Sequence, residues 1–193
     1  MNFPILSSLI LLPTIGALFL MFSKEKNTTT VKYVSLFTSF VNFLISIYLW
    51  FLFDPTTSSF QFIEEREWLI GFIDYKVGID GISILFIILT TLITPLCIIS
   101  VNNTIKNRLR DFLIAILIME SLMIGVFCSL DLFIFYLFFE AGLIPMFLII
   151  GIWGGSRRVY SAFKFFLYTL LGSVLMLVAI ISIYWITGTT DVV

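Results

Sequence analysis

Three ionisable side chains stand inside otherwise apolar stretches of this 193-residue sequence: Glu120, Glu140 and Lys164. The other Lys, Arg, Asp and Glu residues lie between those stretches. An ionised group at the centre of a bilayer costs about 2.5–3.5 kcal/mol on insertion scales, so it normally faces a polar interior and serves an ion or substrate path. If the apolar stretches span a membrane, the chemistry that these three residues predict is proton or ion transfer.

The composition supports a membrane protein and excludes several other classes. Apolar residues make up 60% of the chain and charged residues 12%, whereas soluble domains carry about 25% charged residues. A net charge of -1 supplies no basic field, so we expect no nucleic-acid partner. The absence of histidine excludes histidine-ligated haem and Ser-His or Cys-His catalysis. Cys97 and Cys128 lie in apolar runs, which argues against a disulfide framework or a zinc site.

Apolar windows long enough to cross a bilayer predict an all-α fold, a polytopic transmembrane helix bundle that forms a single domain over residues 1–193. The fourth and fifth windows are nearly continuous, and about 40 residues of helix would measure about 60 Å, twice the hydrocarbon thickness. We therefore expect a tight hairpin at residues 130 and 131, with Asp131 as the N-cap of the fifth helix. The six predicted spans are 3–22, 33–53, 82–101, 112–130, 132–151 and 161–187.

The positively charged residues predict the orientation of the six spans. Most of them lie in the first, third and fifth loops, and only Arg66 and Lys76 lie in the long second loop. By the positive-inside rule, the odd-numbered loops face the cytoplasm or the mitochondrial matrix and both termini lie outside. The residues of the odd-numbered loops are Lys24, Lys26, Lys32, Lys106, Arg108, Arg110, Arg157 and Arg158.

Glu120 and Glu140 are predicted to share one depth in the membrane. Each lies about ten residues from the expected hairpin, or about 15 Å along its helix. If both face the same interior, burial and mutual repulsion favour a carboxyl group that takes up and releases protons near neutral pH. The alternative is that they are protonated or paired structural acids that hold helices together.

Lys164 has two interpretations because it lies only about one turn into the sixth predicted span. Its four-carbon stem can carry the ammonium group to the nearby interface without any functional role. Alternatively, the amine faces inward among Phe165, Phe166 and Tyr168, where desolvation would suit it to proton exchange.

Three ordered segments resemble the antiporter-like membrane subunits of respiratory complex I. Residues 75–83 (YKVGIDGIS) are similar to the entry to their third helix, residues 138–146 (FFEAGLIPM) to their fifth helix and residues 162–169 (AFKFFLYT) to their sixth. The resemblance is strong from about residue 76 to residue 187 and weak before it. The amino-acid sequence of residues 140–146 and the turn at residues 153–155 are most similar to one of the several antiporter-like subunits of this family.

The resemblance implies redox-driven proton pumping, with electron transfer from NADH to quinone in other subunits. NADH, FMN, iron-sulfur clusters and quinone would then bind to partner subunits and not to this chain. By position, Glu140 would be the titratable carboxylate that couples to a lysine on a broken seventh helix. Glu120 would be a second acid in the path, and Lys164 a possible input-side amine. The implied partners are other membrane subunits of complex I, especially neighbouring antiporter-like subunits, in a bacterial or mitochondrial inner membrane.

One feature departs from the family. Its members have about fourteen helices in two inverted halves, whereas this chain ends after the sixth predicted span, at Asp191, Val192 and Val193. We therefore expect an N-terminal fragment, or a split or truncated product, of a longer subunit. Two other interpretations stay open: a subunit of a multisubunit cation/proton antiporter, and a structural membrane segment that transports nothing.

Overall fold

The computed structural model describes residues 4–23, 28–69, 73–101, 105 and 107–192, and the side chains of 67–69, 73 and 74 are outside this description. Within these residues the chain forms six helices, each long and apolar enough to cross a membrane, which confirms the predicted number of spans. Their bounds are α1 (Ile5–Phe22), α2 (Thr28–Leu52), α3 (Ser83–Ser100), α4 (Leu109–Cys128), α5 (Leu132–Trp153) and α6 (Arg158–Thr187).

The predicted spans match these helices apart from their ends. The largest difference is at α2, which begins at Thr28 and not at residue 33, and α6 likewise begins three residues before the predicted start. Helical structure continues through Lys32 and Arg158, because a helix can leave the hydrocarbon layer and extend into the polar interface. Apolar windows therefore locate the membrane-embedded part of each helix and miss its polar ends.

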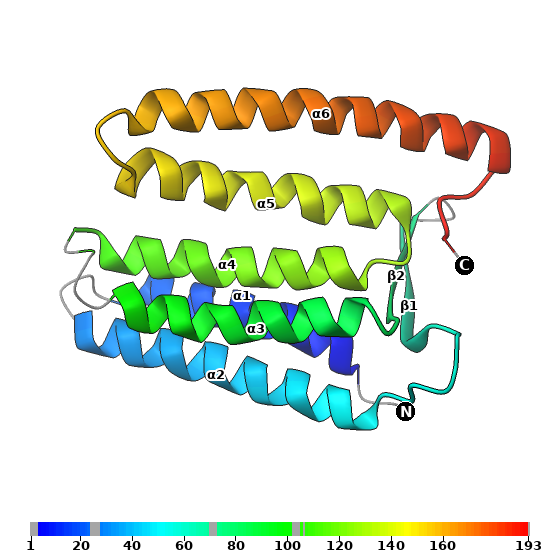
Figure 1. Cartoon of the computed structure of the whole chain (residues 1–193), viewed down its shortest axis with the longest axis horizontal. Helices are drawn as coiled ribbons and strands as arrows, with labels where there is room; N and C mark the ends of the chain where they lie inside the picture. Colours follow the sequence, from blue (N-terminus) through cyan, green and yellow to red (C-terminus); the bar gives the residue numbers. More distant parts are fainter. Residues whose placement is uncertain (1–3, 24–27, 70–72, 102–104, 106, 193) are drawn as a thin grey trace.

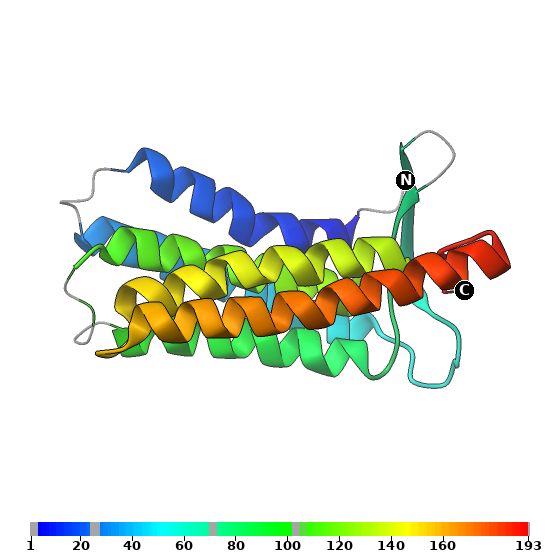
Figure 2. The same ribbon diagram turned by 90° about the horizontal axis from the view of Figure 1, so that it is seen from above.

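The helices form a four-helix core with a two-helix extension. Helices α2 and α4 pack against each other and against both α1 and α3, α5 packs on α4, and α6 packs on α5 (Figures 1 and 2). Half of the most apolar window of α4 is buried, against 11% for α6. Large apolar side chains on α6, including Leu167, Leu171 and Leu175, are exposed, as expected for a surface that meets lipid or another protein in a membrane.

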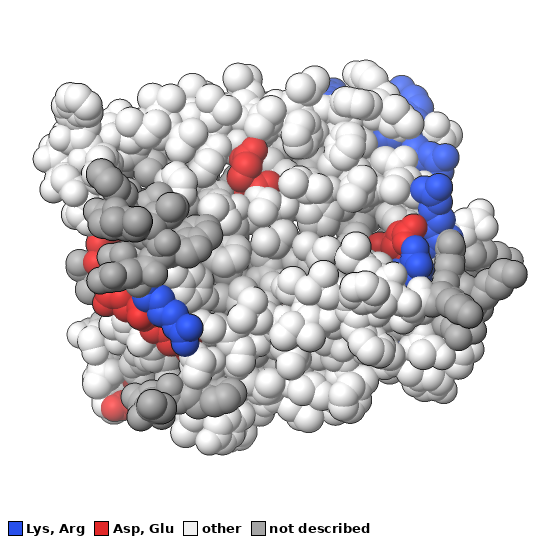
Figure 3. Space-filling model, turned by 180° about the vertical axis from the view of Figure 1, so that it is seen from behind, with Lys and Arg blue, Asp and Glu red and all other residues white. Residues whose placement is uncertain are grey.

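The start of α1 and the end of α6 lie at the same end of the bundle (Figure 1), as an even number of spans requires. On the face shown in Figure 3, Lys and Arg gather at one end and most Asp and Glu at the other. The described basic residues that support the predicted orientation are Lys32, Arg108, Arg110, Arg157 and Arg158, whereas Lys24, Lys26 and Lys106 lie outside the described residues. Which compartment each end faces stays a prediction.

The long second loop contains two antiparallel strands, β1 (Gln61–Leu69) and β2 (Ile73–Ile79), at the acidic end of the bundle. The Glu64 carboxylate on β1 accepts hydrogen bonds from the backbone N–H groups of Leu6 (2.8 Å) and Ser7 (3.0 Å). These are among the first N–H groups of α1, which have no acceptor within their own helix. The β1–β2 hairpin therefore caps α1, and this contact fixes it to the helical core.

The turn between α4 and α5 is held from both sides. Asp131 caps α5, since its carboxylate accepts from the backbone N–H groups of Phe133 (2.8 Å) and Ile134 (3.0 Å), which confirms the predicted cap. The N–H of Leu130 donates to the carbonyl of Lys76 on β2 at 3.0 Å, and its carbonyl accepts from the N–H of Val192 at 2.9 Å. Strand β2 and the segment after α6 thus fix the position of the turn between α4 and α5.

Candidate proton-transfer site

Glu120 and Glu140 lie at the same height in the bundle. Helices α4 and α5 run antiparallel, and each glutamate is about eight residues from the end of its helix that faces the hairpin. At 1.5 Å per residue, both carboxyl groups are about 12 Å from that end. The common depth expected from the sequence therefore agrees with the helix bounds.

Glu120 is enclosed in the four-helix core, with only 2% of its surface exposed. Its Oε1 accepts a hydrogen bond of 2.9 Å from Nδ2 of Asn42 on α2. Its other oxygen, Oε2, and the amide oxygen Oδ1 of Asn42 are buried and have no hydrogen-bond partner among the described residues. Glu120 therefore faces α2, and its side chain is positioned by an amide and not by a cation.

Sequence reasoning missed the polar face of α2 that supplies Asn42. This helix buries four polar side chains at helical spacing, each fully enclosed, and together they form a polar stripe along its core-facing side. The spacing was the signal that could have revealed them, because polar residues repeat every three or four positions within an apolar run. The stripe consists of Ser35, Ser39, Asn42 and Ser46.

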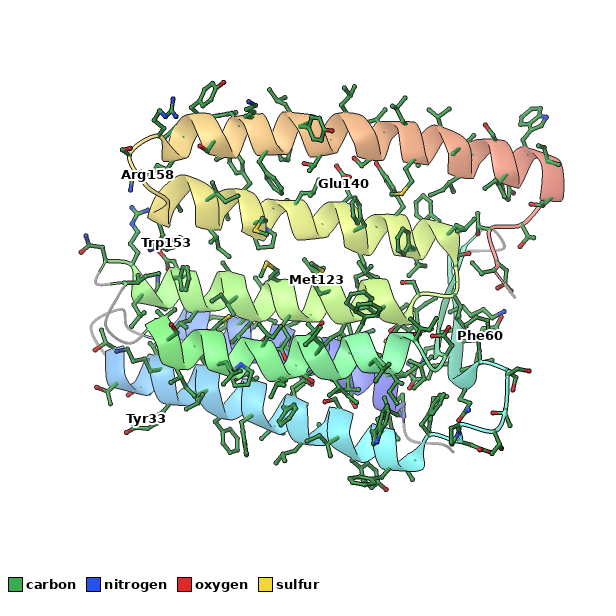
Figure 4. The ribbon with its side chains drawn as sticks, viewed as in Figure 1. Tyr33, Phe60, Met123, Glu140, Trp153 and Arg158 are labelled. Carbon is green, nitrogen blue, oxygen red and sulfur yellow. The ribbon has the colours of Figure 1, made fainter. Side chains whose placement is uncertain are left out.

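Glu140 has a different environment, although it is also a glutamate at mid-height. It is half-buried on α5, and its side chain lies between α5 and α6 (Figure 4). Its Oε2 is buried and has no hydrogen-bond partner among the described residues. Glu120, in contrast, is buried in the four-helix core. The structure therefore does not bring the two carboxyl groups together.

The backbone beside Glu140 is also incompletely hydrogen-bonded within its helix. Helix α5 continues through Pro145 to Trp153. Proline has no N–H group, so it cannot donate to the carbonyl of Ala141, the residue four positions earlier and next to Glu140. A carboxyl group and a carbonyl group thus lie side by side at mid-height, and both can bind water or a donor from a neighbouring segment.

Lys164 lies on the exposed face of α6, near the basic end of the bundle. By helix counting it is about 10 Å closer to that end than Glu140 is. Its ammonium group makes no hydrogen bond or ion pair with any residue that the structure describes. The structure thus does not join Lys164 to either acid, and its part in a proton path stays a prediction.

Comparisons with known proteins agree with the resemblance read from the motifs. Residues 129–193 match the family described as NADH:quinone oxidoreductase/Mrp antiporter, TM. The chain is 58% identical to NADH-quinone oxidoreductase subunit M of Rhodobacter capsulatus over 162 residues, 84% of this chain and 31% of the relative. It is 47% identical to NADH-ubiquinone oxidoreductase chain 4 of Marchantia polymorpha over 188 residues, 96% of this chain and 38% of that relative. The chain therefore spans about a third to two fifths of the length of these relatives.

Solved structures show the same arrangement of helices. A chain of respiratory complex I from Thermus thermophilus with bound NADH matches with a TM-score of 0.81 and 28% identity, over 96% of this chain and 38% of that chain. A chain of the Mrp complex from Dietzia matches with a TM-score of 0.78 over 97% of this chain and 20% of that chain, but its 16% identity shows the fold alone. The subunit type indicated by residues 140–146 is the one that the relatives' names print, subunit M in bacteria and chain 4 in Marchantia. Over the length that it spans, this multi-pass membrane chain is therefore similar in sequence and in helix arrangement to membrane subunits of NADH:quinone oxidoreductase.

Proposed function

We propose that this chain is part of a proton-translocating membrane subunit of NADH:quinone oxidoreductase, in which Glu140 takes up and releases the transported proton. The oxidation of NADH and the reduction of quinone would take place in other subunits, which would hold NADH, FMN, the iron-sulfur clusters and quinone. The chain would lie in a bacterial or mitochondrial inner membrane beside other antiporter-like subunits, with its basic loops on the cytoplasmic or matrix side. This chain would supply part of the proton path, and the redox centres would lie in those other subunits.

The observation that carries this proposal is the buried carboxyl oxygen of Glu140 at mid-membrane depth, which has no hydrogen-bond partner in the described part of the chain. In an apolar layer such a group is stable either as the neutral acid or beside a cation. A cation that approaches to about 4 Å favours the ionised form by about 4 kcal/mol at an effective dielectric constant of 20. A cationic partner that moves toward and away from Glu140 would thus load and unload its proton. Glu140 is only half-buried, so such a partner would have a side from which to approach the residue.

Glu120 and Lys164 have secondary roles beside Glu140. Glu120 is at the correct depth but is held against α2, so we expect its replacement by Gln to reduce pumping less than the same change at Glu140. Lys164 is near the basic end, where a proton would enter from the cytoplasm or matrix. A complete loss of pumping in Glu120→Gln with no loss in Glu140→Gln would reverse this ranking of the two acids.

The test is Glu140→Gln in the full-length assembly, reconstituted into vesicles and driven by NADH. We expect the variant to lose most of its proton pumping and the coupled quinone reduction, because Gln keeps the shape of the side chain but cannot release a proton. Glu140→Asp keeps the carboxyl group and should retain part of both activities. The matched control is Glu65→Gln on β1, an exposed acid outside the spans, which should pump normally. Normal pumping in Glu140→Gln would reject the assignment.

The same vesicles separate this function from cation/proton antiport. An antiporter subunit would exchange protons for a cation when a cation gradient is imposed without NADH. The proposed function expects proton movement only when NADH is oxidised. Cation-driven exchange that is lost in Glu140→Gln would assign the chain to antiport, and a structural segment would show neither dependence.

A further inference from the structure

Two hydrogen-bond acceptors are left over at the contact between α2 and α4. Asn42 donates through Nδ2 to Oε1 of Glu120 at 2.9 Å, and each residue then has one oxygen without a partner among the described residues. Asn42 is fully buried and Glu120 is 2% exposed, so bulk water does not reach either oxygen. Buried polar atoms in folded proteins nearly always have partners, so two orphaned acceptors on one interacting pair need an explanation.

The hydroxyl group of Ser121 and those of the polar stripe on α2 already donate to backbone carbonyls, so none of them supplies the missing donor. Ser121, the residue after Glu120, donates to the carbonyl of Ile10 on α1. On α2, Ser39 donates to the carbonyl of Leu36 at 3.1 Å. A hydroxyl group has only one hydrogen to donate. The donor must therefore belong to the pair itself or to a group that enters between its two side chains.

Charged side chains do not surround the pair either. Helices α1, α2, α3 and α5 and strand β2 pack against α4. Helices α1 and α3 contain no charged residue, and the charged residue of α5 is Glu140, which lies on the side facing α6. The other described titratable groups on these elements and on α4 lie near helix ends or on β2, away from mid-height: Lys32, Tyr33, Tyr48, Tyr75, Lys76, Cys97, Arg110, Asp111, Cys128 and Tyr136.

We propose that Glu120 carries a proton on Oε2 and donates it to Oδ1 of Asn42, so that the two side chains form a closed acid–amide pair with two antiparallel hydrogen bonds. One proton then provides a partner for both orphaned acceptors and removes the negative charge from the apolar core. Asn42 becomes a positioning residue that holds the acid in its neutral form. This inference rests on the contact between α2 and α4 and not on the proposed role of Glu140.

A water molecule between the two oxygens is the competing explanation, because it has two hydrogens and can donate to both acceptors. It would leave Glu120 ionised, with its charge buried and no cation beside it among the described residues. Burial of an unpaired charge is less favourable than protonation of the group, and the closed pair is therefore preferred. The two explanations differ in the charge on Glu120, and an experiment can measure that charge.

Infrared spectroscopy on the assembled complex with isotope-labelled glutamate tests the proposal. The expected result is a carboxylic-acid C=O band that is present throughout the neutral pH range, is absent in Glu120→Gln and remains in Glu140→Gln. If the spectrum assigned to Glu120 contains only carboxylate bands, the water-bridged ion is correct and the proposal is wrong. This readout does not depend on pumping, so it can fail or succeed separately from the proposed function.

Variants that rebuild the pair provide a second test. Glu120→Gln should keep the thermal stability of the assembly, because Gln has the same one-donor and one-acceptor geometry toward Asn42 as the neutral acid. The exchange Asn42→Asp with Glu120→Gln places the acid on α2 and should restore the pair. Asn42→Leu leaves the acid without its partner and should lower the yield of assembled complex about tenfold, as expected for a buried polar group that loses its hydrogen bond. A double variant no better assembled than Asn42→Leu would overturn the proposal.

Discussion

The two glutamates at mid-height show how one residue type acquires two environments in one bundle. Glu120 projects from α4 into the four-helix core, is 2% exposed and hydrogen-bonds to an amide on α2. Glu140 projects from α5 toward α6, is half-buried and keeps a carboxyl oxygen without a partner in the described chain. The two carboxyl groups are matched in depth, so depth alone cannot explain the difference between them.

The difference comes from the helices that surround each acid. Helix α4 contacts α1, α2, α3 and α5, so most directions around it are occupied by packed side chains. Helix α5 packs on α4 and α6 and leaves more of its surface free. A group enclosed on all sides keeps one protonation state, whereas a group at an open face can exchange its proton with a partner that moves. We therefore expect the core to keep its acid in one protonation state and the extension to allow its acid to exchange a proton.

The largest effect is expected from a charge of the wrong sign in the core. Glu120→Lys places an ammonium group at a 2% exposed position with no anionic partner in the described chain, at an expected cost of about 3–5 kcal/mol, the range for an uncompensated buried charge. Glu140→Lys is expected to assemble better because its side chain lies at a more open face. The amount of intact complex on native gels measures both, and equal losses would contradict the contrast between the two regions.

An intermediate effect is expected at the contact that sets the rotation of α5 relative to α4. A Cβ atom on Gly125 of α4 would lie 2.6–2.7 Å from the ring of Phe138 on α5. Gly125→Val therefore forces the helices apart, and overpacking of this kind costs about 1–3 kcal/mol. The matched control is Gly172→Ala on α6, where a Cβ would meet nothing within 4 Å. Thermal unfolding of the assembly should show a lower midpoint for Gly125→Val only, and equal shifts would mean that this contact does not fix the rotation.

The smallest effect is expected from an acid outside the spans. The Ser83 hydroxyl hydrogen-bonds to the Asp80 carboxylate and lowers the pKa of Asp80 below its ordinary value of 3.8, and the backbone N–H of Ser83 donates to it at 2.7 Å. A lowered pKa means that the ionised acid stabilises the start of α3 above pH 3.8 and that this contribution is lost as the pH falls through the folded-state pKa.

The expected contribution of Asp80 is about 1 kcal/mol, typical of a side chain that caps a helix. Asp80→Asn should therefore be less stable than the native chain near neutral pH, and the difference should shrink in acid. Thermal unfolding of the native chain and of Asp80→Asn, once near neutral pH and once in acid, measures this difference in stability. A difference that stays constant on acidification would show that the charge of Asp80 does not stabilise α3.

The sequence predicted the parts of this structure that depend on local composition and counting. The apolar windows predicted the six helices, and the excess length of residues 112–151 predicted the turn between α4 and α5. Asp131 caps α5, as expected. The common depth of the two glutamates followed from the same counting. These features need only the rise of a helix and the thickness of a bilayer.

The features that the sequence did not predict depend on how helices rotate and pack. Counting places Glu120 at mid-depth but does not reveal that it faces Asn42, which is 78 positions away in the chain. The cap that Glu64 provides for α1 joins segments 57 and 58 positions apart, and no local pattern signals it. Of the missed features, only the polar stripe on α2 carried a readable signal, in its helical spacing.

An infrared difference spectrum of the full-length assembly, between its resting state and its state during NADH oxidation, tests the contrast between the two glutamates. We expect a change in a carboxylic-acid band that disappears in Glu140→Gln and persists in Glu120→Gln, because Glu140 is proposed to exchange its proton and Glu120 to keep its own. A change that survives in Glu140→Gln and vanishes in Glu120→Gln would contradict both roles.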